Sequence, residues 1–255
     1  MQKGFVHMVL ITIIFLTGVS LKAQNVDSLF TSANKLYQQE SYLKALELYR
    51  QIEDQDMESS SLYFNMANIY YKTNQVAPSV YYYEKALKLA PNDKDIRFNL
   101  EFAKRMTLDN IEPLPKSLGQ KFMDGIVLRL NYETWSKIAV GLAFLFALLF
   151  LLYHFSYSTS KKRFYFITSG LCVILVTTAV FFAFRNKHYI DNNIQAIVFS
   201  NAVEVKSAPT KSSELYFELH EGTKVTILES LDNWKKIKIA DGKMGWLDAS
   251  AIKEI

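Results

Sequence analysis

The residues that could do chemistry are few, and they lie far apart in the sequence. Cys172 is the only cysteine, and it lies in an apolar stretch without a charged neighbour, which is typical of an inert buried thiol. His220 precedes a turn glycine, and no second histidine or carboxylate follows at metal-ligand spacing, so we expect it to cap a strand end. The carboxylates are scattered along a proline-containing segment rather than paired on one element: Asp109, Glu112 and Asp124. The pattern predicts no catalytic residues, no cofactor and no metal site.

Known catalytic motifs are also missing from the sequence. It contains no H-E-x-x-H, no phosphate-binding glycine loop and no G-x-S-x-G. His154 lies in an apolar stretch without an acidic partner, which favours anchoring near lipid headgroups over a proton relay. We therefore expect a protein that is not an enzyme. A hydrolase or redox enzyme in the linker or C-terminal region is the least favoured alternative.

The charge distribution argues against a nucleic-acid surface. The formal net charge is +4, and it divides by region into about +2 for residues 1–24, about −3 for 25–115, about +7 for 116–188 and about −2 for the remainder. The basic excess surrounds the apolar stretches, as in membrane proteins. We expect a membrane protein and no nucleic-acid partner.

Three apolar stretches of the sequence predict two different kinds of segment. Residues 1–24 have a positive start, an apolar centre and a small residue near the end, which predicts a signal peptide, either cleaved or retained as an anchor. Residues 137–157 and 164–184 are each long enough to cross a hydrocarbon core of about 30 Å. The basic loop 158–163 between them should stay in the cytoplasm. Both soluble parts would then be periplasmic, anchored in the inner (cytoplasmic) membrane.

The region after the leader repeats itself at an offset of 34 residues. Ala33 aligns with Ala67 and Tyr49 with Tyr83, so small residues fall on small and aromatic residues on aromatic. This pattern resembles the tetratricopeptide repeat family. The resemblance implies two helix pairs, over residues 28–57 and 61–90, and a capping helix over 95–107.

In that family, the inner faces of the first helices form a peptide groove. The family clamp for a C-terminal carboxylate is not matched, because Phe30 and Asp95 stand at its lysine places and Asn99 at its arginine place, so a partly apolar segment is expected. Asn34 and Asn65 match places where amides hold an extended peptide backbone, although these asparagines could instead only cap or cross-link helices. The implied groove positions are Phe30, Asn34, Tyr37, Gln38, Asn65, Asn68, Tyr71, Lys72, Phe98, Asn99 and Phe102.

The C-terminal region changes to a period of two residues with recurring turn signals. The stretches "LHEGTKV" and "NWKKIKIADGKMGWL" resemble the bacterial SH3 domain family, which implies a small barrel over residues 190–255. Some members bind peptidoglycan peptides and others mediate protein contacts. Trp234 and Trp246 are candidate contacts, and we expect at least one of them to lie in the core.

The linker 108–136 contains a predicted interfacial helix. In "KFMDGIVLRLNYETW", Phe122, Ile126, Leu130 and Trp135 fall near one helical side, as in a helix that lies in the headgroup layer before a span.

The predicted fold class is therefore a multi-domain membrane protein: an all-α tetratricopeptide solenoid over residues 25–107, a two-helix transmembrane hairpin and a small all-β SH3-like barrel. In domain order the chain resembles the BatE family of Bacteroides aerotolerance proteins. This resemblance implies a periplasmic scaffold in an oxidative-stress complex with von Willebrand factor A-type membrane proteins. The alternative is a peptidoglycan-binding envelope protein acting through the barrel.

Overall fold

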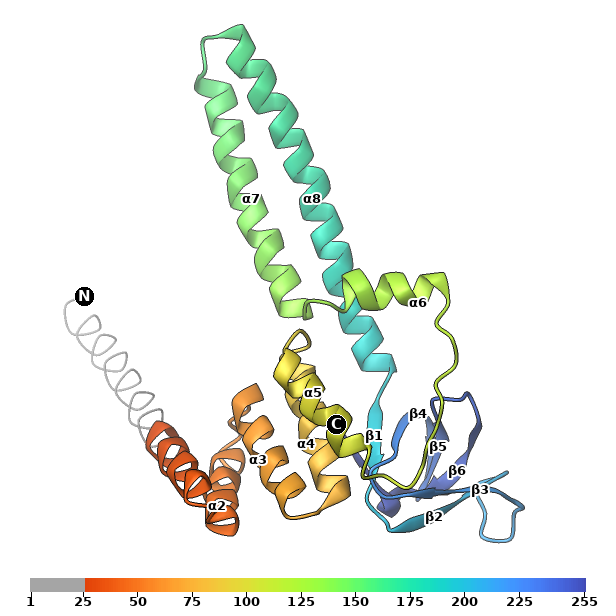
Figure 1. Cartoon of the computed structure of the whole chain (residues 1–255). Helices are drawn as coiled ribbons and strands as arrows, with labels where there is room; N and C mark the ends of the chain where they lie inside the picture. The colour runs from red at the N-terminus through yellow and green to blue at the C-terminus, as the bar shows by residue number, and fades with distance from the viewer. Residues whose placement is uncertain (1–25) are drawn as a thin grey trace, which may run out of the picture. The chain divides into compact units, whose positions relative to one another are not determined.

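The structure is a computed structural model, and it describes residues 26–255. This part of the chain begins with helical hairpins. Residues 26–38 and α2 (Tyr42–Glu53) form the first pair, and α3 (Ser60–Lys72) and α4 (Val76–Leu89) form the second (Figure 1). α5 (Lys94–Lys104) follows without a partner helix of its own. The predicted tetratricopeptide architecture is thus present, whereas the predicted signal peptide lies outside the described residues.

The 34-residue offset is visible in the packing of these hairpins. The small residues Ala33 and Ala67 are both fully buried, as are Ala45 and its counterpart Ser79. Small side chains at these positions let the two helices of a pair approach closely. The Ser79 hydroxyl is satisfied because it donates to the carbonyl oxygen of Ala67 at 3.2 Å.

The turns inside the two pairs also repeat. Glu40 (φ 60°) and Asn74 (φ 59°) both adopt the left-handed conformation that ends a helix. In each turn a backbone N–H reaches back across the left-handed residue, from Ser41 to Leu36 O and from Gln75 to Tyr70 O, both at 2.9 Å. Identical turn geometry makes the two pairs successive copies of one unit.

The predicted interfacial helix is shorter than the sequence pattern indicates. α6 (Leu118–Phe122) runs directly into η1, a π-helical turn at Met123–Val127, and the chain then breaks before α7 (Tyr132–Phe155). Asn131 caps the start of α7 by accepting a hydrogen bond from the Thr134 N–H at 2.9 Å. The prediction that Leu130 and Trp135 share one helical side with Phe122 was therefore wrong, because an N-cap starts a new helix between them.

The two apolar segments form a helical hairpin, but its helices extend beyond the apolar residues. α7 and α8 (Thr159–Asn192) are, by length and composition, long and apolar enough to cross a membrane. The connection comprises residues 156–158, so the predicted loop 158–163 was too long, and its basic residues lie in the first turns of α8. Lysine and arginine are good helix formers, so the helix begins before the apolar stretch does.

Small residues lie between α7 and α8. Ala139, Ser169, Cys172 and Ala179 are buried there, although most of the two helices is exposed. Small side chains permit close approach of helices in an apolar environment. Cys172 therefore has a packing position between the helices.

The C-terminal strands form one antiparallel, seven-stranded sheet with the order β3-β2-β6-β5-β4-β1-β7. Their bounds are β1 Gln195–Val198, β2 Ala202–Lys206, β3 Leu215–His220, β4 Lys224–Leu231, β5 Trp234–Lys238, β6 Met244–Asp248 and β7 Ile252–Glu254, with a 3-10 turn at Ala249–Ala251. The barrel starts at residue 195 rather than at 190, because α8 continues to Asn192.

The barrel core consists of alternating side chains from most of these strands. Val205, Leu219, Ile237 and Leu247 are among its buried residues. At Gly245, a Cβ atom would lie 2.5 Å from Val205 Cγ1, so glycine permits the close approach of β2 and β6. Ile111, from the segment before α6, also packs against this core.

The described chain divides into two compact units. The first extends to Ala86 and includes Asp95–Met106, and the second comprises Leu87–Lys94 and Thr107–Ile255. The second unit thus contains the segment after α5, the apolar hairpin and the barrel.

Candidate binding surfaces

The predicted groove residues lie on the first helices of the pairs and on α5. Each is half-buried or exposed in the structure, so none belongs to the buried core. Tyr71 is 37% exposed and Phe98 is 64% exposed, an unusually large fraction for a phenylalanine. These helices therefore present aromatic and amide side chains on their accessible sides.

An asparagine–tyrosine pair recurs in both repeats. The Tyr49 hydroxyl donates to Asn34 Oδ1 at 2.5 Å, and the Tyr83 hydroxyl donates to Asn68 Oδ1 at 2.5 Å. Aromatic rings sit beside each pair, with 5.7 Å between the ring centroids of Phe30 and Tyr49 and 5.9 Å for the equivalent pair one repeat later. The second helix of each pair thus fixes the orientation of an amide on the first.

A third amide joins the first pair. Asn65 Nδ2 donates to Asn34 Oδ1 at 3.0 Å and to the Tyr49 hydroxyl oxygen at 3.2 Å. This network joins the two repeats, as the cross-linking alternative from the sequence anticipates. The NH2 groups of Asn34 and Asn68, however, have no acceptor among residues 26–255, so each can still donate to a ligand.

The tyrosine hydroxyls in these networks remain donors at physiological pH. Burial raises the pKa of Tyr49 to about 12, against the smaller opposing effect of its bond with Asn65. Burial also raises the pKa of Tyr83 above its usual value. Because a protonated hydroxyl is needed to donate to an amide oxygen, the asparagine orientation is stable across the physiological range.

The third unit contributes a different surface. Phe98 and Phe102 pack edge to face with 4.8 Å between ring centroids, and the Arg105 guanidinium lies 5.0 Å from the Phe102 ring. Asn99 Nδ2 donates to the backbone oxygen of Asp95 within the same helix. Asn99 therefore does not continue the asparagine–tyrosine pattern, and the aromatic pair dominates α5.

A polar cluster between α2, α3 and α4 was missed from the sequence. Lys85 Nζ lies 3.0 Å from Glu53 Oε1 and 4.0 Å from the centre of the Tyr63 ring. The Tyr82 hydroxyl donates to Glu53 Oε2 at 2.8 Å, and the Tyr82 ring stacks on Tyr70. The run of three tyrosines at 81–83 was the available signal, since buried tyrosines need hydrogen-bond partners.

The two candidate tryptophans of the barrel differ in burial. Trp246 is 8% exposed, and its partners across the sheet are Lys236 on β5 and Lys206 on β2. Lys236 Nζ lies 5.8 Å from the Trp246 ring centre. Trp234 is half-buried and pairs with Leu231 across the β4–β5 hairpin. Trp234 is thus the more accessible of the two rings.

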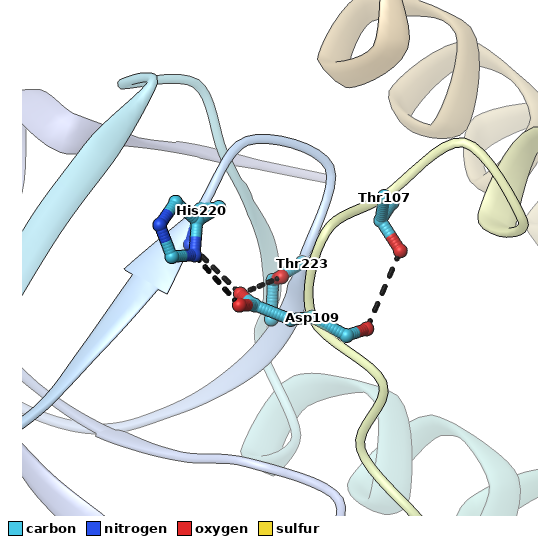
Figure 2. Close-up of polar contacts among 4 residues, drawn as sticks. All are labelled: Thr107, Asp109, His220 and Thr223. Atoms are coloured by element: carbon cyan, nitrogen blue, oxygen red, sulfur yellow. Dashed lines mark hydrogen bonds and ion pairs between the residues drawn. The ribbon is translucent and has the colours of Figure 1, made fainter.

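The segment that follows α5 lies on the barrel through one carboxylate (Figure 2). Asp109 accepts hydrogen bonds from the His220 backbone N–H at 2.7 Å, His220 Nδ1 at 2.8 Å and the Thr223 hydroxyl at 2.5 Å. Figure 2 shows the contacts from His220 and Thr223 meeting at the Asp109 carboxylate, while the Thr107 hydroxyl contacts the Asp109 backbone oxygen. A residue 111 positions away from His220 thus caps the β3–β4 turn.

This pairing shifts the pKa values of both side chains. Partial burial acts to raise the pKa of Asp109, but the hydrogen bonds from Thr223 and His220 outweigh it, and the pKa falls below the usual value. The hydrogen bond to Asp109 raises the pKa of His220 above 6.5, against desolvation, and the charges of Asp109 and Glu218 add to the rise. From the sequence, Asp109 was expected to be a scattered linker residue and His220 to lack a carboxylate partner, so this pair was missed.

The base of the apolar hairpin carries a second contact that was missed. Asn186 Nδ2 donates to the backbone oxygens of Val127 at 2.8 Å and Leu130 at 2.7 Å, and Trp135 Nε1 donates to Val127 O at 3.0 Å. These carbonyls belong to the end of η1 and the following break, where the helix supplies no donors. Asn186 therefore holds the turn before α7 against α8.

Within residues 26–255, no three His, Cys, Asp or Glu side chains are grouped so that they could hold a metal ion.

Two parts of the chain match known protein families. Residues 60–93 match the tetratricopeptide repeat family, and residues 201–253 match the bacterial SH3 domain family. No curated protein matches the chain. Among solved structures, the C-terminal SH3 domain of myosin IB from Entamoeba histolytica is similar at 23% identity, covering 25% of this chain and 95% of that chain with a TM-score of 0.19. The chain is a tetratricopeptide repeat and bacterial SH3 domain protein with two long apolar helices between these modules.

Proposed function

We propose that the chain is a membrane-anchored, non-catalytic scaffold that binds segments of partner proteins. The tetratricopeptide face is its main recognition surface, and the SH3 domain is the second. Tetratricopeptide and SH3 domains are both associated with protein binding. The expected ligand of the helical face is an extended, partly apolar segment, because amide donors and aromatic rings line it rather than a cluster of cations.

The repeated orientation of two amides carries this proposal. Asn34 and Asn68 each have Oδ1 occupied by a tyrosine from the same repeat, so the free NH2 group of each is held in a fixed direction. Amide NH2 donors can bind the backbone carbonyl groups of an extended chain. Exposed Phe98 supplies an apolar contact on the third unit. A partner segment with backbone carbonyls and one apolar side chain fits these groups.

Site-specific photocrosslinking in intact cells tests this surface. A benzophenone amino acid at position 98 should capture a partner protein, whereas the same group at Leu43 on α2, which is 71% exposed, should not. Leu43 is a matched control because it is equally apolar and accessible but lies outside the predicted surface. Identical products at both positions, or none at position 98, would contradict the proposal.

A loss-of-binding variant complements the crosslink. Asn34→Ala together with Asn68→Ala removes the two free donors, and we expect recovery of the crosslinked partner to fall about thirtyfold, on the basis of two lost hydrogen bonds of about 1 kcal/mol each. Both residues also hold tyrosines, so the variant must keep a folded array. Crosslinking that survives at full yield in a folded variant would exclude the amides from binding.

The proposed location is the inner membrane with both soluble modules in the periplasm. The length and composition of α7 and α8 support membrane association. The contact between Asp109 and His220 supports an even number of crossings, because these residues flank the hairpin and must lie on the same side of a membrane to touch. The basic residues 161–163 at the tip support a cytoplasmic loop.

The partner that we propose comes from the family resemblance in domain order. A von Willebrand factor A-type membrane protein of an aerotolerance complex is the expected binding partner, and mass spectrometry of the position-98 crosslink identifies or excludes it. A crosslinked protein of another class would leave the scaffold function in place and remove the aerotolerance assignment.

Peptidoglycan binding through the barrel is the second candidate. The observation that favours it is the half-buried Trp234 beside exposed Leu231 on the β4–β5 hairpin, an accessible apolar ring on a domain whose family includes peptidoglycan binders. Full-length protein in detergent should then co-sediment with purified sacculi, and Trp234→Ala should abolish this. Trp246→Phe is the control, because Trp246 is nearly buried. Sacculi that bring down no protein would eliminate this candidate.

A further inference from the structure

The segment after α5 is bound to the barrel at a polar end and at an apolar end. We name residues 109–114 the strap. At its start, Asp109 takes three hydrogen bonds from the β3–β4 turn. At its end, the Leu114 N–H donates to Ala240 O at 3.1 Å, on the turn between β5 and β6. The strap thus crosses from one turn of the barrel to another.

Apolar side chains of the strap fit the barrel surface between these two attachments. Ile111 packs against the buried core cluster. Leu114 lies over Gly242, where an added Cβ would come within 2.8 Å of Leu114 Cδ1. Gly242 also has a φ of 93°, so the turn requires glycine there, whereas an added Cβ would displace only the end of the exposed Leu114 side chain. Shape and hydrogen bonding together make this a specific docking site.

We propose that the barrel surface between the β3–β4 and β5–β6 turns is a docking site for the chain's own strap, and that the docked strap is a releasable latch that sets the length of the tether that follows α5. The small number of contacts explains why the strap can be released. One carboxylate, one backbone hydrogen bond and two aliphatic side chains hold the strap, and it pairs with the barrel through no strand ladder. Segments with so few contacts open at a fraction of the global unfolding free energy.

Release of the strap would lengthen the flexible segment between α5 and the next fixed point of the chain. α5 ends at Lys104, so five residue steps separate it from Asp109 while the latch is closed. When the strap is free, the next fixed point is Ser117 at the start of α6, thirteen steps from Lys104. For a flexible chain this changes the root-mean-square tether length from about 12 Å to about 20 Å. The closed latch therefore raises the effective concentration of one module near a ligand held by the other.

Hydrogen exchange on the full-length protein in detergent micelles tests the docking. Asp109→Asn should raise the exchange of peptides that cover residues 109–116 and 218–223 at least tenfold, because the His220 and Leu114 amides lose their acceptors or their docking. The strands at 234–248 should keep their protection. Glu112→Gln is the matched control, since Glu112 is an exposed carboxylate on the same strap. Unchanged strap exchange in Asp109→Asn would overturn the proposal.

Leu114→Ala is a second variant that releases the other end without touching the carboxylate network. It keeps the test valid if Asp109→Asn disturbs folding of the barrel, because Leu114 is not part of the barrel core. Spin labels at exposed Leu43 and Leu228, in a Cys172→Ser background, then measure the tether. Both strap variants should widen the distance distribution relative to wild type and Glu112→Gln. Equal widths in all four proteins would show that the strap does not set the tether.

Discussion

Tyr49 and Tyr83 make the same hydrogen bond in consecutive repeats, but the amides that they hold differ in how well they are satisfied. Asn34 Oδ1 also accepts from Asn65, whereas Asn68 Oδ1 has Tyr83 as its donor. We expect Tyr49→Phe to cost about 1 kcal/mol and Tyr83→Phe about 1 to 2 kcal/mol, because the second leaves an acceptor without its partner.

Hydrogen-exchange free energies of the α3 amides measure both losses. Tyr42→Phe is the control, because the Tyr42 hydroxyl has no hydrogen-bond partner among residues 26–255 and its ring contact with Tyr37 is retained. An equal, negligible effect in all three variants would mean that the recurring pair does not stabilise the repeats.

The Asp109–His220 pair predicts a pH window for the strap. The pKa of His220 is raised in the folded state, so its contribution is complete below about 6.5 and is lost as pH rises through the folded value. The pKa of Asp109 is lowered, so its contribution is present above about 3.9 and is lost as pH falls through the folded value. The strap should therefore be most stable between about pH 4 and 6.5.

The thermal midpoint of the barrel, followed by tryptophan fluorescence at pH 5.5 and pH 8.5, checks this window. Wild type should lose stability at the higher pH, and His220→Gln should remove that difference, since glutamine can donate to Asp109 but does not titrate. Glu218, the other carboxylate that acts on His220, remains in both proteins. A pH difference that persists in His220→Gln would assign it to another group.

At the scale of elements, the turn formed by α6, η1 and α7 depends on α8 through one side chain. Asn186 is 1% exposed and supplies two donors to carbonyls that η1 leaves open, whereas its own Oδ1 has no partner among the described residues. We expect Asn186→Leu to free residues 123–131, with exchange in that segment rising about tenfold or more.

Thr178→Val is the matched control on the same helix. The Thr178 hydroxyl donates to Ile174 O within α8, so its loss should leave residues 123–131 protected. If Asn186→Leu also leaves them protected, the Trp135 bond and the aromatic contact with Phe182 hold the turn by themselves.

The sequence predicted contacts between residues that the repeat relates, and it missed contacts between residues that no repeat relates. The 34-residue offset identified Ala33, Ala67, Tyr49 and Tyr83 as equivalent, and all four are buried in the structure. Asp109 and His220 are 111 positions apart, and neither residue belongs to a repeat that would relate them. Helix ends were also misplaced, because polar residues continue a helix beyond its apolar part, as they do at the start of α8.

At the scale of the whole molecule, the strap constrains membrane topology independently of charge. Single cysteines at positions 112, 161 and 228 can be introduced into Cys172→Ser, because the natural sequence has no other cysteine. A membrane-impermeant maleimide applied to spheroplasts should label positions 112 and 228 and spare 161 until the cells are lysed. Positions 112 and 228 must behave alike, since the strap that carries one is docked on the barrel that carries the other.

Each of the other labelling patterns would contradict a different part of the proposed topology. Labelling of 112 and 228 on opposite sides would exclude the docked strap and the paired crossing together. Labelling of all three positions from outside would show that α7 and α8 do not span the membrane, despite their length and hydropathy. Labelling of 161 alone would place both modules in the cytoplasm, which would overturn the periplasmic scaffold while leaving the latch possible. One topology agrees with both the basic residues 161–163 and the Asp109–His220 contact. In it, the strap and the barrel lie outside the cytoplasm and the tip of the helical hairpin lies inside.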